Sequence, residues 1–166
     1  AYTMETKARD TNKEFTATGA PAFPTSLWSN GTTMWVVDVL KDTYAYDYTI
    51  DTAGAITATR NELKEITAAT LTAAGNGDPR TMWSNGITMW IVDIVQLKIY
   101  AYDYTIDTTG TITETYNASK DFDKSILSAA GNTDPRGLWS DGTTMWVGNS
   151  SGQKILAYDL ATQERP

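Results

Sequence analysis

Short apolar runs that end at turn-forming residues divide most of the chain, and this pattern predicts β-strands. In the middle of the chain, residues 81–84 form a short apolar run that ends at Asn85 and Gly86, a pair typical of tight hairpin turns. Residues 87–92 then form a run rich in β-branched and aromatic side chains, which favour strands. The two runs therefore predict an antiparallel hairpin.

Two further strands are predicted after this hairpin. Residues 98–104 carry three tyrosines at alternate positions, with alanine and aspartate between them, so the tyrosines would share one face of a strand. A turn over 107–110 separates this strand from another one over 111–116. Four short antiparallel strands are thus expected in one structural unit.

The same four-strand pattern recurs along the chain at a nearly constant period. The most similar stretches cover residues 27–38, 82–93 and 138–149, and their first tryptophans are 55 and 56 residues apart. A period of this length indicates an array of one supersecondary unit. We therefore predict an all-β chain of about three β-propeller blades, each a four-stranded antiparallel unit, and rank a β-solenoid second.

The phase of the repeats predicts where the units begin and end. Residues 1–24 are expected to hold the fourth strand of a preceding blade, around residues 7–16, and a loop. Residues 25–79 and 80–135 are expected to form two blades, and 136–166 to supply the first three strands of a further blade. The chain is therefore expected to begin in the middle of a repeat, as a processed product or a piece of something longer.

Three blades are fewer than the roughly four to eight of closed propellers. The chain is thus expected to belong to a larger ring or to a ring completed by oligomerisation, because open strand edges invite pairing. Two chains could complete a six-bladed ring, each donating its first strand to the last blade of the other. Head-to-tail joining into a filament is the alternative.

One stretch between two predicted blades contains helix-forming residues. In residues 61–74, threonine and β-branched side chains interrupt these helix formers, which lowers the helix propensity. The pattern therefore favours a non-helical connection there.

Aromatic and acidic residues that recur in every unit have structural explanations. Large aromatics at repeated strand positions usually pack blade against blade, and we expect this of Trp35, Trp90 and Trp146. A carboxylate at the end of a strand commonly caps a turn. This role is predicted for the acidic residue that ends the third strand of each unit: Asp47, Asp103 and Asp159.

Charge and missing residue types exclude several classes of function. The net charge is −7, from 13 basic and 20 acidic residues, so the chain is a poor partner for nucleic acids or anionic lipids. Histidine and cysteine are absent, which excludes Ser-His-Asp and Cys-His relays. No apolar stretch approaches the roughly 20 residues of a membrane span. We predict no cofactor, no nucleic-acid partner and no membrane insertion.

Three stretches of the last unit carry a resemblance to known families: residues 135–142 read PRGLWSDG, 145–147 read MWV and 154–159 read KILAYD. They resemble six-bladed propellers of the NHL and SMP-30/gluconolactonase type, and tandem propeller repeats of bacterial cell-surface proteins. The resemblance implies the propeller fold. It implies little about activity, because one fold hosts many functions.

The lactonase branch of that resemblance implies a divalent metal held by carboxylate and amide side chains near the central channel. Where that motif has an aspartate between proline and glycine, this chain has Arg136, and the earlier units have Arg80 and Thr25. A positive charge there would repel a cation held by oxygen ligands. We therefore expect no metal, and a metal-dependent lactonase-like hydrolase remains the alternative function.

The alternation of strand direction places the loop before the first strand and the loop after the second strand at the same end of the propeller. Arg80 and Arg136 would therefore share a rim with Asp38 and Asp93, and Asn149 holds the matching position of the last unit. Ion pairs between them are the favoured interpretation. A binding rim formed by these five residues is the alternative.

These observations predict a non-enzymatic, extracellular or cell-surface β-propeller that acts in binding, adhesion or assembly. Its partners are expected to be further copies, or further blades of a longer chain, that pair with its open strand edges. A protein or glycan is a candidate ligand. The alternatives are the hydrolase named above and a purely structural subunit of a surface filament.

Overall fold

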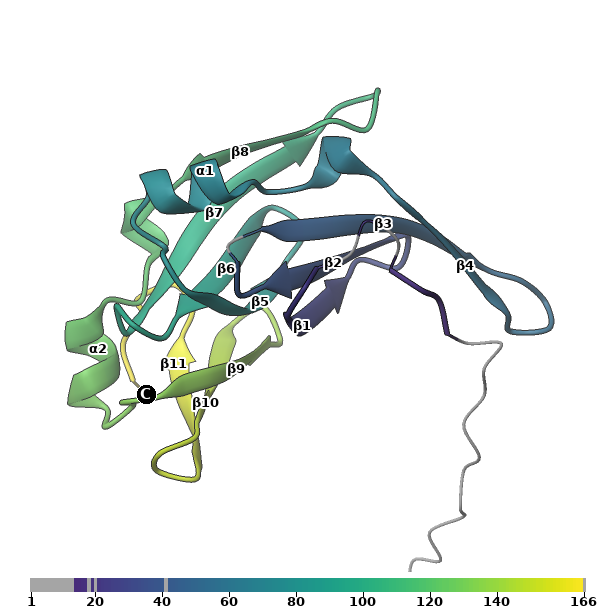
Figure 1. Ribbon diagram of the computed structural model, residues 1–166. Helices are drawn as coiled ribbons and strands as arrows, with labels where there is room; N and C mark the ends of the chain where they lie inside the picture. Colours follow the sequence, from purple (N-terminus) through teal and green to yellow (C-terminus); the bar gives the residue numbers. More distant parts are fainter. Residues whose placement is uncertain (1–13, 18, 20, 41, 166) are drawn as a thin grey trace, which may run out of the picture.

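The chain folds into three antiparallel β-sheets that pack against one another (Figure 1). The computed structural model describes residues 14–17, 19, 21–40 and 42–165. The predicted all-β architecture of blade-like units is confirmed. Within the described residues the sheets form an open stack and not a closed ring.

Each strand pairs with its sequence neighbour, so the strand order in every sheet follows the chain. Blade 1 consists of β1 (Pro24–Ser29), β2 (Thr33–Asp38), β3 (Thr43–Ile50) and β4 (Ile56–Arg60). Blade 2 consists of β5 (Pro79–Ser84), β6 (Thr88–Asp93), β7 (Lys98–Ile106) and β8 (Ile112–Tyr116). Blade 3 consists of β9 (Pro135–Ser140), β10 (Thr144–Asn149) and β11 (Lys154–Asp159). Strand β5 contacts both β1 and β9, so the first strands of the blades are neighbours.

The predicted hairpin turn joins the first two strands of each blade. In blade 2, Oδ1 of Asn85 accepts hydrogen bonds from the main-chain N–H groups two and three residues ahead, at 3.0 and 2.8 Å. Gly86 has a φ of 92°, which glycine adopts without a steric penalty. Asn30 and Asp141 make the corresponding hydrogen bonds in blades 1 and 3.

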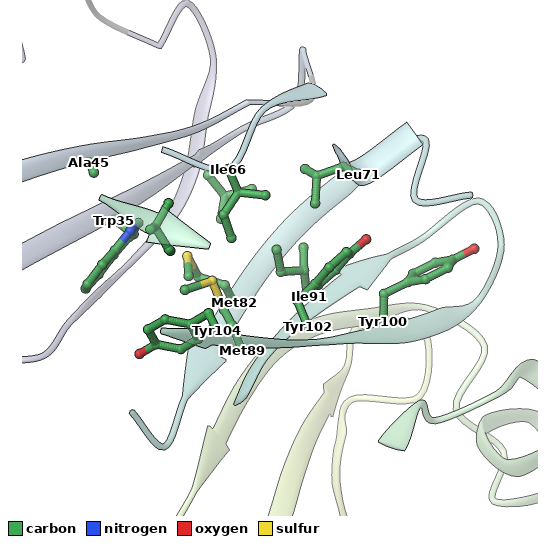
Figure 2. Packing of buried hydrophobic residues seen from close by; sticks show 12 residues of the cluster. Trp35, Ala45, Ile66, Leu71, Met82, Met89, Ile91, Tyr100, Tyr102 and Tyr104 are labelled. Carbon is green, nitrogen blue, oxygen red and sulfur yellow. The ribbon is translucent and has the colours of Figure 1, made fainter. Parts of the chain in front are cut away.

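Hydrophobic cores fill the spaces between the blades, as a repeat array requires. Each blade has a Trp face and a Met–Tyr face. The Trp faces carry Trp35 and Ala45, Trp90 and Ala101, and Trp146 and Ala157, and the Met–Tyr faces carry Met34 and Tyr46, Met89 and Tyr102, and Met145 and Tyr158. The Trp face of blade 1 packs against the Met–Tyr face of blade 2 (Figure 2), and the Trp face of blade 2 packs in the same way against blade 3.

The predicted burial of the repeated tryptophans is confirmed for two of the three. Trp35 and Trp90 lie between blades, with exposed fractions of 0% and 3%. Trp146 stays partly exposed, because no described sheet covers the Trp face of blade 3. The prediction was therefore wrong for Trp146.

Short helices occupy the connections between blades, where the sequence pattern favoured a non-helical chain. These are the 3-10 turns η2 (Glu62–Lys64) and η3 (Ala118–Lys120), and the helices α1 (Ala68–Ala73) and α2 (Lys124–Ala129). Thr67 caps α1 by accepting a hydrogen bond from a main-chain N–H, and Leu71 of α1 is fully buried between blades 1 and 2. This burial outweighs the weak helix propensity. No helix of the described residues is long and apolar enough to cross a membrane.

The fourth strand predicted around residues 7–16 falls mostly outside the described residues. Residues 14–16 are described and are not in a strand. Phe15 packs against Tyr46 of the Met–Tyr face of blade 1, with 5.5 Å between the ring centroids. The described end of this segment therefore contributes to the cover of that face.

Candidate functional site

The predicted rim lies at the end of the blades where the second strands finish. Asp38, Asp93 and Asn149 each end the second strand of a blade and pair with the proline that starts the first strand. Arg80 and Arg136 directly follow that proline in blades 2 and 3. The structure thus places these predicted residues at corresponding corners of the blades. A binding role for them stays a prediction.

The carboxylates of this rim hold loops in place. Asp38 and Asp93 are fully buried. In Asp93, Oδ2 accepts from the N–H groups of Gly77 and Asp78 at 2.7 and 3.1 Å, and Oδ1 accepts from two N–H groups of the following turn, both at 2.8 Å. Asp38 accepts two such hydrogen bonds, at 2.9 and 2.6 Å. The Asn149 amide likewise donates to a main-chain carbonyl at 2.8 Å.

The predicted ion pairs between rim arginines and rim aspartates are wrong. Arg80 pairs with Asp78 at 2.8 Å, and Arg136 pairs with Asp134 at 2.7 Å. In both cases the carboxylate lies two residues earlier in the chain and is partly exposed. The carboxylate of Asp93 is instead buried and already accepts four main-chain hydrogen bonds.

A metal centre receives no support from the described residues. They contain no group of three or more histidine, cysteine, aspartate or glutamate side chains that could hold a metal ion. Arg80 and Arg136 also occupy the positions where the lactonase resemblance implies an aspartate.

A second polar cluster recurs around the acidic residues that were predicted to cap turns. In blade 2, Asp103 lies inside β7, and its Oδ1 accepts from Lys120 Nζ and Thr88 Oγ1, both at 2.5 Å. Its Oδ2 accepts from Asn117 at 2.7 Å. The indole N–H of Trp90 donates to the main-chain oxygen of Lys120 at 3.1 Å. We call these five residues the lysine clamp of blade 2.

Blade 1 contains the same lysine clamp. Lys64 Nζ lies 2.6 Å from Oδ1 of Asp47, and Trp35 donates to the main-chain oxygen of Lys64 at 2.9 Å. Thr33 and Asn61 also donate to Asp47. Burial alone would raise the pKa of the Asp47 carboxyl, but the hydrogen bonds from Lys64, Thr33 and Asn61 lower this pKa below its ordinary value of 3.8. The clamp fastens the connection after β4 to β2 and β3.

We expect the substitution Lys64→Met to remove a stabilisation that depends on pH. Because the folded-state pKa of Asp47 is lowered, ionised Asp47 stabilises the fold above its unfolded pKa, and this contribution is lost as the pH falls through the folded pKa. The free energy of unfolding should drop by about 0.5–1 kcal/mol at pH 7 for this partly exposed pair, and by almost nothing at about pH 2. Urea unfolding at both pH values measures the difference, with the exposed Lys124→Met as control. Equal losses at both pH values would contradict the clamp.

Blade 3 contains only part of the clamp. The residues that correspond to Thr88, Trp90 and Asp103 are Thr144, Trp146 and Asp159. Asp159 accepts from the main-chain N–H groups of Ala161 and Thr162, both at 2.9 Å, so the predicted turn cap is found here and not at Asp47 or Asp103. Within the described residues, no lysine or arginine pairs with Asp159, and the indole N–H of Trp146 has no hydrogen-bond acceptor.

The Trp face of blade 3 forms an open, apolar hollow of about 530 Å³. It is lined by Gly137, Leu138, Trp139, Trp146, Gly148 and Ile155. Trp139 and Ile155 are 57% and 75% exposed, whereas Ile99, the equivalent of Ile155 in blade 2, is fully buried. The same side-chain positions that form a core in blade 2 are thus uncovered in blade 3.

The sequence reading missed both the lysine clamp and the open face. A signal for the clamp exists, because a lysine, an acidic residue and a large apolar residue recur after the fourth strand, at 64–66 and at 120–122. The open face has no local signal, since its tryptophans stand in the same motif as those of the covered blades.

Comparison with known proteins identifies no relative of this chain. No protein-family model, no curated protein and no solved structure matches the chain.

Proposed function

We propose that this is a non-enzymatic protein of the cell exterior that acts by assembly, with the Trp face of blade 3 as its binding surface for a further blade. One observation carries the proposal. The Trp faces of blades 1 and 2 are covered by the next blade, and that of blade 3 is open. Large exposed aromatic side chains are typical of interaction surfaces.

The tryptophans of blade 3 already have the arrangement found in the covered blades. The ring centroids of Trp139 and Trp146 are 5.0 Å apart, with 37° between the ring planes. The corresponding distances in blades 1 and 2 are 5.3 and 5.5 Å, with angles of 34° and 31°. The open face therefore keeps the shape that receives a blade elsewhere in the chain.

The chemistry of the hollow favours a blade over a small polar ligand. Its lining side chains are those of tryptophan, leucine and isoleucine, next to two glycines. A site for a small polar ligand usually combines an apolar lining with a few hydrogen-bonding groups that orient the ligand. A Met–Tyr face is apolar and aromatic, and it is what the equivalent faces of blades 1 and 2 already bind.

Two further points support the non-enzymatic role and the location outside the cell. The chain contains no histidine or cysteine, so the common nucleophile–base relays are absent, and the buried rim carboxylates are engaged by main-chain N–H groups. The location outside the cell rests on the resemblance of the repeat to those of bacterial surface proteins.

We expect the substitution Ile155→Asp to weaken assembly by about 100-fold, because a carboxylate would have to lose its water in the apolar contact. Sedimentation velocity over a range of concentrations measures the effect. Ile87→Asp is the matched control, since Ile87 is 67% exposed, lies in the turn between β5 and β6, and does not line the hollow. Identical masses for the wild type and Ile155→Asp at every concentration would contradict the proposal.

A further inference from the structure

Blade 1 exposes an apolar side chain whose counterpart in blade 2 is buried. The register of the first two strands gives Leu27 in blade 1 and Met82 in blade 2 equivalent positions on the Met–Tyr faces. Met82 is 3% exposed and lies with Trp35 in the core between blades 1 and 2 (Figure 2), whereas Leu27 is 64% exposed. Within the described part of the chain, no Trp face covers the Met–Tyr face of blade 1.

The other end of the stack exposes the complementary surface. The Trp face of blade 3 is open, with Ile155 and Trp139 exposed, although Ile99, the equivalent of Ile155, is fully buried in blade 2. Blades 1 and 3 are the two ends of the stack. One chain therefore carries both surfaces of a junction between blades, and each surface is uncovered.

Phe15, before blade 1, occupies the place of a residue that connects two blades. Phe15 packs on Tyr46 with 5.5 Å between ring centroids, and Phe122, after β8, packs on the equivalent Tyr158 with 5.7 Å. Phe122 is fully buried, because it also shares a core with Trp90 of the preceding blade. Phe15 stays partly exposed, so its surroundings differ from those of Phe122 by one Trp face.

The connecting residue also pairs with the edge of the preceding blade through its main chain. The N–H of Ile99 donates to the oxygen of Phe122, and the N–H of Phe122 donates to the oxygen of Ile99, both at 3.0 Å. Thr43 and Ile66 form the same bridge on blade 1. Ile155 holds this position on β11, and none of the described residues forms such a bridge with it.

We propose that the open Trp face of blade 3 binds the Met–Tyr face of blade 1 of a second copy, with Phe15 of that copy bridged to Ile155. This inference rests on the proposed function and names its partner. The contact repeats a junction that each chain already makes twice, and it covers Leu27 as Met82 is covered. Because the contact joins two different surfaces, two copies of three blades close head to tail into a ring of six, within the usual range of about four to eight blades.

Light scattering after size exclusion tests the partner with the substitution Leu27→Asp. The wild type should form a dimer with twice the chain mass of 18.2 kDa. Leu27→Asp should weaken this dimer by about 100-fold, as Ile155→Asp should, because either carboxylate would have to lose its water in the apolar junction. The matched control Ile87→Asp should leave it unchanged. All three side chains are exposed in the single chain, so the circular dichroism spectra should stay the same.

A mixture of Leu27→Asp and Ile155→Asp tests the head-to-tail arrangement. Blade 3 of the first variant and blade 1 of the second are both intact, so the mixed pair retains one unaltered junction. The mixture should therefore associate more tightly than either variant alone. A mixture that associates no more tightly than the single variants would overturn the arrangement.

The remaining outcomes separate this partner from the proposed function. A dimer that Ile155→Asp dissociates but Leu27→Asp leaves intact would overturn blade 1 as the partner and keep the Trp face of blade 3 as the binding surface. A wild type that stays at 18.2 kDa at all concentrations would overturn both. Hydrogen exchange at the N–H of Ile155 should slow by about tenfold or more in the dimer, and unchanged exchange there would overturn the bridge to Phe15.

Discussion

The substitution Trp90→Ala is expected to lower the free energy of unfolding by about 3–5 kcal/mol, the usual cost of emptying a large aromatic site in a core. Trp90 is 3% exposed and lies in the core between blades 2 and 3, where it packs with Val92, Met145 and Val147. Its loss opens a cavity between two sheets. Because the blades are held together by these cores, we expect both sheets to loosen, and chemical denaturation followed by circular dichroism measures the change.

Trp90→Phe separates packing from hydrogen bonding. Phenylalanine keeps most of the apolar contact but loses the N–H that donates to Lys120 at 3.1 Å. We expect a loss of about 1–2 kcal/mol, from one buried hydrogen bond and a reduced contact area. If Trp90→Phe destabilised the fold as much as Trp90→Ala, packing between blades would not be the main contribution of this residue.

The substitution Asp93→Ala is expected to have the second largest effect. It should lower the free energy of unfolding by about 3 kcal/mol, because it leaves buried N–H donors without a partner. Four main-chain N–H groups donate to the Asp93 carboxylate. The equivalent Asp38 accepts two such hydrogen bonds. Asp38→Ala should therefore lower the free energy of unfolding by about half as much as Asp93→Ala. The ratio of the two losses follows from the number of hydrogen bonds at each site.

Hydrogen exchange locates the same effect along the chain. The N–H groups of Gly77 and Gln96, which donate to Asp93 at 2.7 and 2.8 Å, should exchange faster in Asp93→Ala and stay unchanged in Asp38→Ala. Unchanged exchange in Asp93→Ala would mean that other groups hold these two loops.

The repeat and the strand pattern could be predicted because they depend on local alternation. The three tyrosines of residues 98–104 lie on one face of β7, as predicted, and Tyr102 is fully buried in the core against blade 1. The burial of Trp146 could not be predicted in the same way. It depends on a neighbouring sheet, and the local motif is the same whether or not that sheet is present.

The rim and the connections show a similar limit. The sequence indicated correctly that Asp93 and Arg80 belong to one end of the blades, but their partners depend on which loop N–H groups turn inward. Those N–H groups come from the loop before β5 and the loop after β6. They donate to the Asp93 carboxylate, which forms no ion pair with an arginine. The helix α1 was missed because its stability comes from the burial of Leu71 between two sheets and not from the helix propensity of its residues.

The two faces of each blade also give the chain a direction. The Met–Tyr face of blade 2 packs against the Trp face of blade 1, and the Trp face of blade 2 packs against blade 3. A unit such as residues 80–135 therefore contains both of the surfaces that form a junction between blades. Duplication of that stretch within the gene would add a blade that already matches both of its neighbours. Proteins built on this unit can therefore change their number of blades in a single genetic step, without first evolving a new contact surface.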